Sequence, residues 1–317
     1  MKVSEHLNNS SRPHISFEIL PPTKGTSVEN LYQSLDPLME FKPSYIDITC
    51  HQAEVSFYER DDGLLERRII RKRPGTVAIA SAIQNRYGVD VVPHLICDGF
   101  SREETEDALI DLNYLGIENI LVVRGDPNPV SSRFIPQKNG YHHSIELLQQ
   151  INNMNHGKYL DEALQNPHPT QFCTGVAGYP EKHVEAPNFS SDLHYLKQKV
   201  DAGASYIVTQ MFFDNQKYFD FVKACRDIGI KVPVIPGLKA VSIKKHLNLL
   251  PQTFHVDLPE ELSVEIEKCR NNECVRELGI EWALHQSREL FAGGVPGIHF
   301  FTMGRSDNIR KIIQQLF

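Results

Sequence analysis

The chain has 317 residues, of which 41% are hydrophobic and 23% are charged, and its net charge is -7. These values are typical of a soluble globular protein with one large domain or two ordinary ones. The negative charge argues against nucleic acid as a general partner. No apolar run is long enough to cross a bilayer, and the N-terminus lacks the apolar core of a secretion signal. We therefore expect a cytoplasmic protein that binds neither nucleic acid nor membranes.

The six cysteines are scattered along the chain, and most lie inside apolar patterns. They are Cys50, Cys97, Cys173, Cys225, Cys269 and Cys274. This usage favours reduced thiols over disulfides. Cys269 and Cys274 are too isolated from other metal-binding residues to suggest a zinc site, so we expect no bound metal.

The segment 15–19 alternates apolar and polar side chains, which is the spacing of a β-strand, and Pro21 and Pro22 end that strand. It carries Glu18 among aliphatic and aromatic neighbours. Partial burial raises the pKa of a carboxyl group, and general acids that work at neutral pH are made in this way. Glu18 is therefore a candidate general acid. The alternative is a glutamate at a strand edge that faces solvent.

Apolar strand patterns and amphipathic helix patterns alternate along the chain. The predicted strands are 15–19, 45–50, 91–97, 119–123, 172–179, 206–213, 232–238 and 298–302. The predicted helices are 28–39, 76–85, 101–115, 144–154, 191–200, 218–228, 242–269 with breaks near Pro251 and Pro259, 274–291 and 308–316. Residues 155–169 form a polar insertion without a periodic face.

The polar and charged segment 51–74 is interpreted as a mobile loop. It contains a basic cluster, namely Arg67, Arg68, Arg71, Lys72 and Arg73. We interpret this cluster as solvated surface, with contact to a phosphate group as the alternative.

The alternation predicts a single (β/α)8 TIM barrel domain that spans residues 1–317. Nearly all the strands are apolar on both faces, as buried parallel strands are, and no hairpin signal joins any pair. The alternative is a doubly wound open sheet. The glycine fingerprint of dinucleotide binding is absent after the first strand, which counts against that alternative.

A barrel places its chemistry at the carboxyl ends of its strands. Those ends carry a ring of polar residues, namely Glu18, Thr49, His94, Asp126, Tyr179, Gln210, Lys239 and Arg305. Two carboxylates, a histidine and an amide in one mouth favour a binding or catalytic site. Structural readings stay open for each: His94 as a core histidine, Asp126 as a turn cap before Pro127, and Gln210 as a strand-end amide.

A series of motifs in chain order resembles the methylenetetrahydrofolate reductases of the short bacterial type, which are FAD-dependent barrels. The motifs are S-F-E-I-L-P-P (16–22), D-I-T (47–49), P-H-L (93–95), V-R-G-D-P (123–127), Y-P-E-K-H-V-E-A (179–186), L-K-Q-K-V-D-A-G-A (196–204), T-Q-M-F-F-D (209–214), I-P-G-L (235–238) and H-F-F-T-M-G-R (299–305). They cover almost the whole chain, and no counterpart of the long C-terminal regulatory domain of the eukaryotic enzymes is expected.

The resemblance implies a two-step, ping-pong hydride transfer. NADH or NADPH reduces FAD, and the flavin then reduces 5,10-methylenetetrahydrofolate to 5-methyltetrahydrofolate for methionine synthesis. Glu18 matches the general acid, Asp126 a catalytic residue beside the pterin and flavin, and Gln210 and Arg305 folate contacts. The positions assigned to FAD are Thr49, His94, Arg124, Gly125, Asp126, His142, Tyr179, His183, Asp192, Tyr195 and Lys199. A homo-oligomer is also expected.

The chain departs from the family pattern at a few positions. Gln198 replaces a frequent arginine, and Leu249 and Leu250 lie where an aromatic residue is expected to stack on folate or nicotinamide. Two other functions remain open from the residues alone. One is a flavin-free aldolase that forms a Schiff base at Lys239, and the other is a ligand-binding protein without turnover.

Overall fold

The computed structural model describes residues 1–9, 13–125, 134–304 and 306–317. Eight parallel strands close into a barrel in the order β1-β10-β9-β8-β7-β6-β5-β2. This confirms the predicted TIM barrel and excludes the open sheet. The strands are β1 (His14–Ile19), β2 (Tyr45–Ile48), β5 (Asp90–Ile96), β6 (Asn119–Val123), β7 (Cys173–Gly178), β8 (Tyr206–Met211), β9 (Val234–Leu238) and β10 (Gly297–Phe301).

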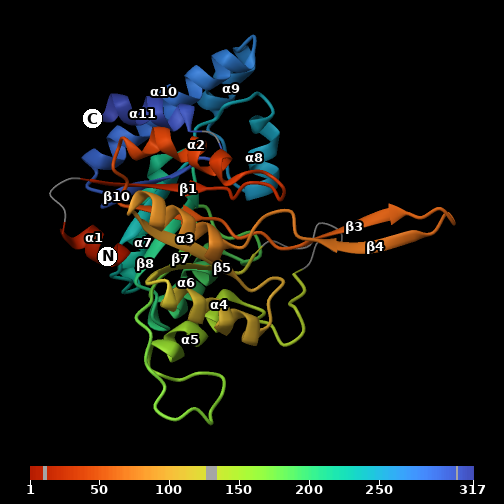
Figure 1. The fold of residues 1–317 in the computed structure, drawn as a ribbon. Helices are drawn as coiled ribbons and strands as arrows, with labels where there is room; N and C mark the ends of the chain where they lie inside the picture. The colour runs from red at the N-terminus through yellow and green to blue at the C-terminus, as the bar shows by residue number, and fades with distance from the viewer. Residues whose placement is uncertain (10–12, 126–133, 305) are drawn as a thin grey trace.

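Helices surround the barrel, and most of them follow the predicted ranges within a few residues (Figure 1). They are α1 (Val3–Asn9), α2 (Val28–Met39), α3 (Thr76–Tyr87), α4 (Arg102–Tyr114), α5 (Ser144–Asn155), α6 (Phe189–Asp201), α7 (Asn215–Asp227), α8 (His246–Phe254), α9 (Glu260–Lys268), α10 (Asn272–Ala292) and α11 (Asp307–Leu316). Among the described helices, none is both long enough and apolar enough to cross a membrane.

The register of β1 places Glu18 at the mouth of the barrel. Its Cα is paired with that of Asp47 on β2 and with that of Phe301 on β10. One residue earlier, Phe17 and Phe300 are fully buried. Because successive side chains of a strand face opposite sides, Phe17 and Phe300 pack toward the helices, whereas Glu18 faces the inside of the barrel near its mouth.

The opposite end of the barrel is closed by the N-terminal segment. The Val3 backbone N–H donates to the Asn119 Oδ1 atom at 2.8 Å, and the N-terminal ammonium lies 2.7 Å from Asp90. Val3 itself is fully buried. The N-terminal segment with α1 therefore covers the amino ends of β5 and β6, opposite the mouth.

Segment 51–74 is not the loop that the sequence predicted. It contains an antiparallel hairpin of β3 (Glu54–Glu59) and β4 (Leu65–Ile70), which projects away from the barrel (Figure 1). The prediction was wrong because the charged residues mask a period-two pattern in each strand, and Asp62-Gly63 is a typical turn sequence between two such strands. The hairpin pairs with no strand of the barrel.

The prediction of reduced thiols is wrong for one pair of cysteines. Cys269 and Cys274 form a disulfide across the turn between α9 and α10, where their Cα atoms lie 5.5 Å apart. Sequence spacing alone could not show that this turn brings both side chains together. The other four cysteines carry free thiols, as expected.

The predicted helix 242–269 is two helices, and only one of its prolines marks the break. Pro251 lies inside α8. The chain leaves α8 at His255, whose φ of 54° is left-handed, and Pro259 then directly precedes α9. Residues of α8 line a pocket together with residues at the ends of β9 and β10.

Gly279 allows α10 to approach the segment that follows β9. A Cβ atom at Gly279 would lie 1.9 Å from the Val241 carbonyl oxygen. We expect Gly279→Ala to lower the free energy of unfolding by about 2 kcal/mol or more, because either the helix or this segment must shift. Denaturant unfolding measures the change. Gly75→Ser is the control, because residue 75 is the N-cap of α3, where serine is favoured, and a Cβ there would meet nothing closer than 4.0 Å. Equal midpoints for the two variants would contradict the packing argument.

Candidate functional site

Four ionisable side chains from four adjacent strands meet beneath the mouth. Glu18 comes from β1, Asp47 from β2, His94 from β5 and His299 from β10. The Glu18 Oε2 atom lies 3.8 Å from His94 Nε2 and 3.9 Å from His299 Nε2. Glu18 keeps 17% of its side chain exposed, whereas Asp47 and His299 are fully buried. The cluster therefore opens to the mouth mainly through Glu18 and to a small extent through His94, whose side chain is 7% exposed, and has its second carboxylate in the core.

Asp47 lies between the two imidazoles on the core side. Its Oδ1 atom is 3.5 Å from His94 Nε2, and its Oδ2 atom is 3.7 Å from His299 Nδ1. Both oxygens lack a hydrogen-bond partner among the described residues, as do the Nε2 atoms of both histidines. His299 Nδ1 shares a hydrogen bond of 2.9 Å with the Ser16 hydroxyl, which fixes the ring. A buried carboxylate without hydrogen bonds favours positive charge on the His299 ring beside it.

The electrostatics of Glu18 differ from the sequence-based prediction of a raised pKa, which is wrong. Burial does raise the pKa of Glu18, but the interaction with His299 and the positive charges on His94, His299 and His51 outweigh it, so the pKa is lowered. The separations of 3.8 and 3.9 Å exceed a hydrogen bond, so this lowering is a charge effect. Conversely, burial lowers the pKa of His299, but the charges of Asp47 and Glu18 outweigh it and raise the pKa. In the free site the proton therefore lies on His299 rather than on Glu18.

A second polar group gathers on the opposite side of the mouth, at the ends of β6 and β7. Arg124 donates to both carboxylate oxygens of Glu185, at 2.5 and 2.8 Å. The His183 ring packs edge-on against Tyr179 with centroids 4.7 Å apart. The backbone N–H of His183 donates to the Asp192 carboxylate at 2.9 Å. The structure thus brings together four residues that the resemblance assigns to FAD.

Lys199 continues this group from α6. Its Nζ donates to the Ala177 carbonyl at 3.2 Å. Burial lowers the pKa of Lys199 to about 8, although the charge of Asp192 opposes the change. Burial likewise lowers the pKa of His183, against the charges of Asp192 and Glu185. These partly buried donors are suited to an anionic or heterocyclic ligand.

Gly125 and Thr49 lie at two further strand ends. Gly125 has a φ of 93°, and a Cβ there would lie 3.1 Å from the Asp98 Cβ atom, so glycine is needed for the chain to turn here. The Thr49 hydroxyl donates to the Ile19 carbonyl at 3.3 Å, which ties the ends of β1 and β2 together. Thr49 therefore lies next to the end of the strand that carries Glu18, and Gly125 lies beside the end of β5.

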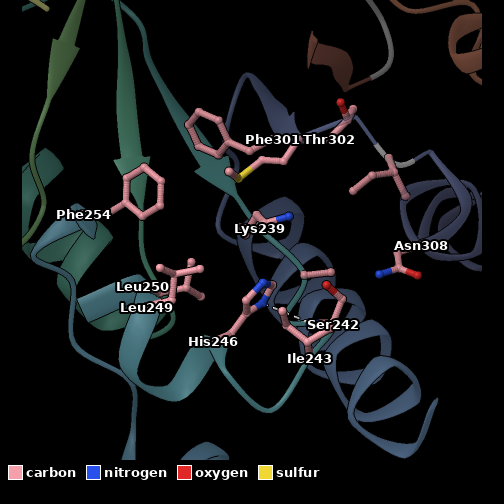
Figure 2. A pocket seen from close by; sticks show the side chains of 13 residues that line it. Lys239, Ser242, Ile243, His246, Leu249, Leu250, Phe254, Phe301, Thr302 and Asn308 are labelled. Carbon is pink, nitrogen blue, oxygen red and sulfur yellow. Dashed lines mark hydrogen bonds between the residues drawn. The ribbon is translucent and has the colours of Figure 1, made fainter. Parts of the chain in front are cut away.

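A pocket lies beside this cluster, at the carboxyl ends of β9 and β10 and under α8 (Figure 2). Lys239 extends into its centre, with Phe301 on one side and His246 on the other (Figure 2). Burial and the charge of Lys239 lower the pKa of His246 to about 4, so this ring is neutral at physiological pH. Phe301 connects the pocket to the cluster, because its ring packs edge-on against His299 with centroids 5.0 Å apart.

The other predicted site residues are less closely engaged. The Gln210 Oε1 atom accepts a hydrogen bond from the Met211 N–H at 2.9 Å. Tyr195 is exposed on α6 and lies near the ring of His194. The exposed His142 donates its backbone N–H to Glu146 at 2.7 Å, before α5. The contacts of Tyr195 and His142 do not link them to the residues around Arg124. Asp126 and Arg305 lie outside the described residues.

Sequence reasoning missed Asp47 and His299 as functional candidates. Both lie one or two residues inside strands that are otherwise apolar, so their patterns indicated core positions. A usable signal was present: a charged or ionisable residue inside an otherwise buried strand requires a partner. The identity of that partner depends on strand neighbours, and His299 is far from Asp47 in the sequence.

Comparisons with known proteins agree with this architecture. A family model described as methylenetetrahydrofolate reductase matches residues 2–317. An Arabidopsis thaliana protein named methylenetetrahydrofolate reductase (NADH) 1 is 32% identical over 100% of this chain and 51% of its own length. The chain thus spans about half the length of the plant relatives. A 5,10-methylenetetrahydrofolate reductase from Pectobacterium carotovorum is 30% identical over 96% of this chain and 91% of its own length.

A solved structure shows the same fold. It is a Clostridium thermocellum protein described as binding two copies of 5-methyl-5,6,7,8-tetrahydrofolic acid, with a TM-score of 0.57, 15% identity, and coverage of 98% of this chain and 95% of that one. At this identity the likeness concerns the fold alone. The match of the family model along nearly the whole chain is the stronger finding, and with it we conclude that this chain belongs to the methylenetetrahydrofolate reductase family.

Proposed function

We propose that this protein reduces 5,10-methylenetetrahydrofolate to 5-methyltetrahydrofolate, with NADH or NADPH as the hydride donor, in a ping-pong reaction that supplies methionine synthesis. The observation that carries the proposal is the cluster of Glu18, Asp47, His94 and His299 at the mouth of a barrel of this family. In this cluster the Glu18 carboxylate faces the mouth, and the neighbouring His299 holds a proton.

FAD is the cofactor that this site would hold, and the residues present fit it. The Nε2 atom of His94 is buried without a hydrogen-bond partner among the described residues, which suits the polar edge of a heterocycle. Arg124, Lys199 and His183 are partly buried donors that suit phosphate and ribose oxygens. When bound, FAD supplies hydride transfer between the nicotinamide and the folate.

The proton for the folate comes from the pair of Glu18 and His299. Opening the methylene bridge of the substrate requires a proton on a folate nitrogen. In the free site this proton lies on His299, beside an ionised Glu18. Flat ligands that cover the mouth exclude water and disfavour the separated charges, so the proton moves to Glu18, which faces the substrate. Until the ligands bind, the charge of Asp47 keeps this proton on His299.

The pocket around Lys239 suits the remainder of the folate. Phe301, Leu249 and Leu250 provide apolar contacts for an aromatic ring, and the Lys239 ammonium suits a carboxylate tail. The two leucines would then replace the aromatic residue that the family pattern places there. Only the family resemblance assigns three further residues to the substrate, namely Gln210, Asp126 and Arg305. A role for Lys239 in binding the carboxylate tail also makes a Schiff base at this residue unnecessary.

The purified chain is expected to be yellow and to show a flavin absorbance spectrum. Anaerobic mixing with NADH, and separately with NADPH, should bleach that spectrum, and stopped-flow rates decide which nucleotide is preferred. A colourless protein that binds no added FAD would contradict the proposal.

Glu18→Gln should separate the two half-reactions. Bleaching by the nicotinamide needs no proton from Glu18, so its rate should change little. Reoxidation by methylenetetrahydrofolate should fall by about 10²–10⁴, because a glutamine cannot donate a proton to the substrate. Stopped-flow measurement of both steps makes the comparison within one variant, and equal losses in both would contradict the role of Glu18.

Asp47→Asn should move the pH profile. Asp47 raises the pKa of His299 above its ordinary value of 6.5, so the proton is retained until pH rises through that raised pKa. Without this charge His299 loses its proton at lower pH, and the basic limb of the folate half-reaction should shift downward by about one pH unit or more. Asp90→Asn, at the opposite end of the barrel, is the matched control and should leave the limb in place.

A further inference from the structure

The hairpin of β3 and β4 carries an apolar face that nothing in the described chain covers. Alternation along the paired strands puts Val55, Phe57, Glu59, Leu65, Arg67 and Ile69 on one face. Phe57 is 57% exposed, Leu65 is 68% exposed and Ile69 is 64% exposed. Figure 1 shows that this ribbon stands away from the barrel and its helices. So many large apolar side chains on one projecting ribbon are typical of an interaction surface.

The opposite face of the hairpin is different, because its charges are satisfied within the hairpin. Arg68 pairs with Glu66 at 2.8 Å and lies 4.9 Å above the centre of the Tyr58 ring. Lys72, just beyond β4, pairs with Glu54. This face therefore needs no partner, whereas the face with Phe57 does.

We propose that the face containing Phe57 is the contact by which two copies of this chain associate. The face is self-complementary in charge. Val55 lies opposite Ile69, Phe57 opposite Arg67, and Glu59 opposite Leu65. It thus has one cation and one anion among four apolar side chains, so it carries no net charge.

A two-fold axis along the ribbon places β3 of one copy over β4 of the other. Val55 then meets Ile69 of the second copy. Arg67 meets the Phe57 ring of the second copy. On β3 of the second copy, Glu59 is the next side chain after Phe57 on the same face, so its carboxylate lies within reach of the Arg67 guanidinium. Val55 and Ile69 thus cover each other, Arg67 covers the Phe57 ring, and Arg67 of one copy is a diagonal neighbour of Glu59 of the other.

This surface is independent of the proposed reaction. It specifies the contact for the homo-oligomer that the sequence leads us to expect. The strands have six residues each. The face is therefore smaller than a standard interface of about 800 Å² per partner, and we expect a micromolar dissociation constant.

Sedimentation velocity of the full chain over about 1–100 µM tests the proposal. The wild-type chain should pass from monomer to dimer. Phe57→Glu should raise the dissociation constant at least about thirtyfold, because it buries a charge at the centre of the contact. Ser56→Glu, on the adjacent residue and the opposite face, is the matched control and should leave the dimer intact. Thermal unfolding of the barrel checks that both variants remain folded.

Exchanging the charges of Arg67 and Glu59 tests whether the partner on this face is a second copy of the chain. Arg67→Glu alone should weaken the dimer, because it places two carboxylates together across the axis, and adding Glu59→Arg should restore it. A wild-type chain that stays monomeric throughout the range would overturn the proposal. So would Phe57→Glu and Ser56→Glu variants that associate alike, or a double variant that fails to recover.

Discussion

The site depends on one buried charge, the carboxylate of Asp47. It is fully buried, and its oxygens have no hydrogen-bond partner among the described residues. An isolated carboxylate in this position would cost several kcal/mol of desolvation. The nearby imidazoles of His94 and His299 offset this cost when they are positively charged. In the proposed mechanism the proton is thus retained by a charge in the core rather than by Glu18 itself.

The barrel register places this charge next to the mouth. Glu18 and Asp47 are paired at the same level of β1 and β2, and Phe301 is paired with Glu18 from β10. Because parallel strands present their carboxyl ends together, residues that are far apart in the sequence meet within 4 Å. Phe301 also borders the pocket around Lys239. One aromatic residue therefore separates Glu18 from the pocket that we propose for the rest of the folate.

The elements that extend the barrel serve different purposes. The segment around Val241 approaches α10 closely because residue 279 is glycine, and this contact fixes one wall of the pocket. The hairpin packs little against the barrel, so its apolar face can be explained by association rather than by the stability of the core. The proposed active site at the mouth and the proposed surface for association are thus built from separate segments.

Much of the fold could be predicted from the sequence, because helix and strand periodicity reflects burial that is local to each element. The strand Asn119–Val123 and the helix Val28–Met39 were predicted at their observed bounds. The hairpin was missed because the six arginines and lysines of segment 51–74 give it a polar composition that conceals the alternation of its strands. The disulfide of Cys269 and Cys274 was missed because it depends on the conformation of a turn.

The sequence by itself determined the family, the barrel and the acid on the first strand, since each is carried by a contiguous motif or a regular period. Only the tertiary structure decided where the proton lies. The sequence-based argument considered the burial of Glu18 alone, which raises its pKa. The fold adds His94 and His299, each less than 4 Å away, and their charges reverse the sign. A pKa depends on the sum of nearby charges, and those neighbours come from strands that only the closed barrel brings together.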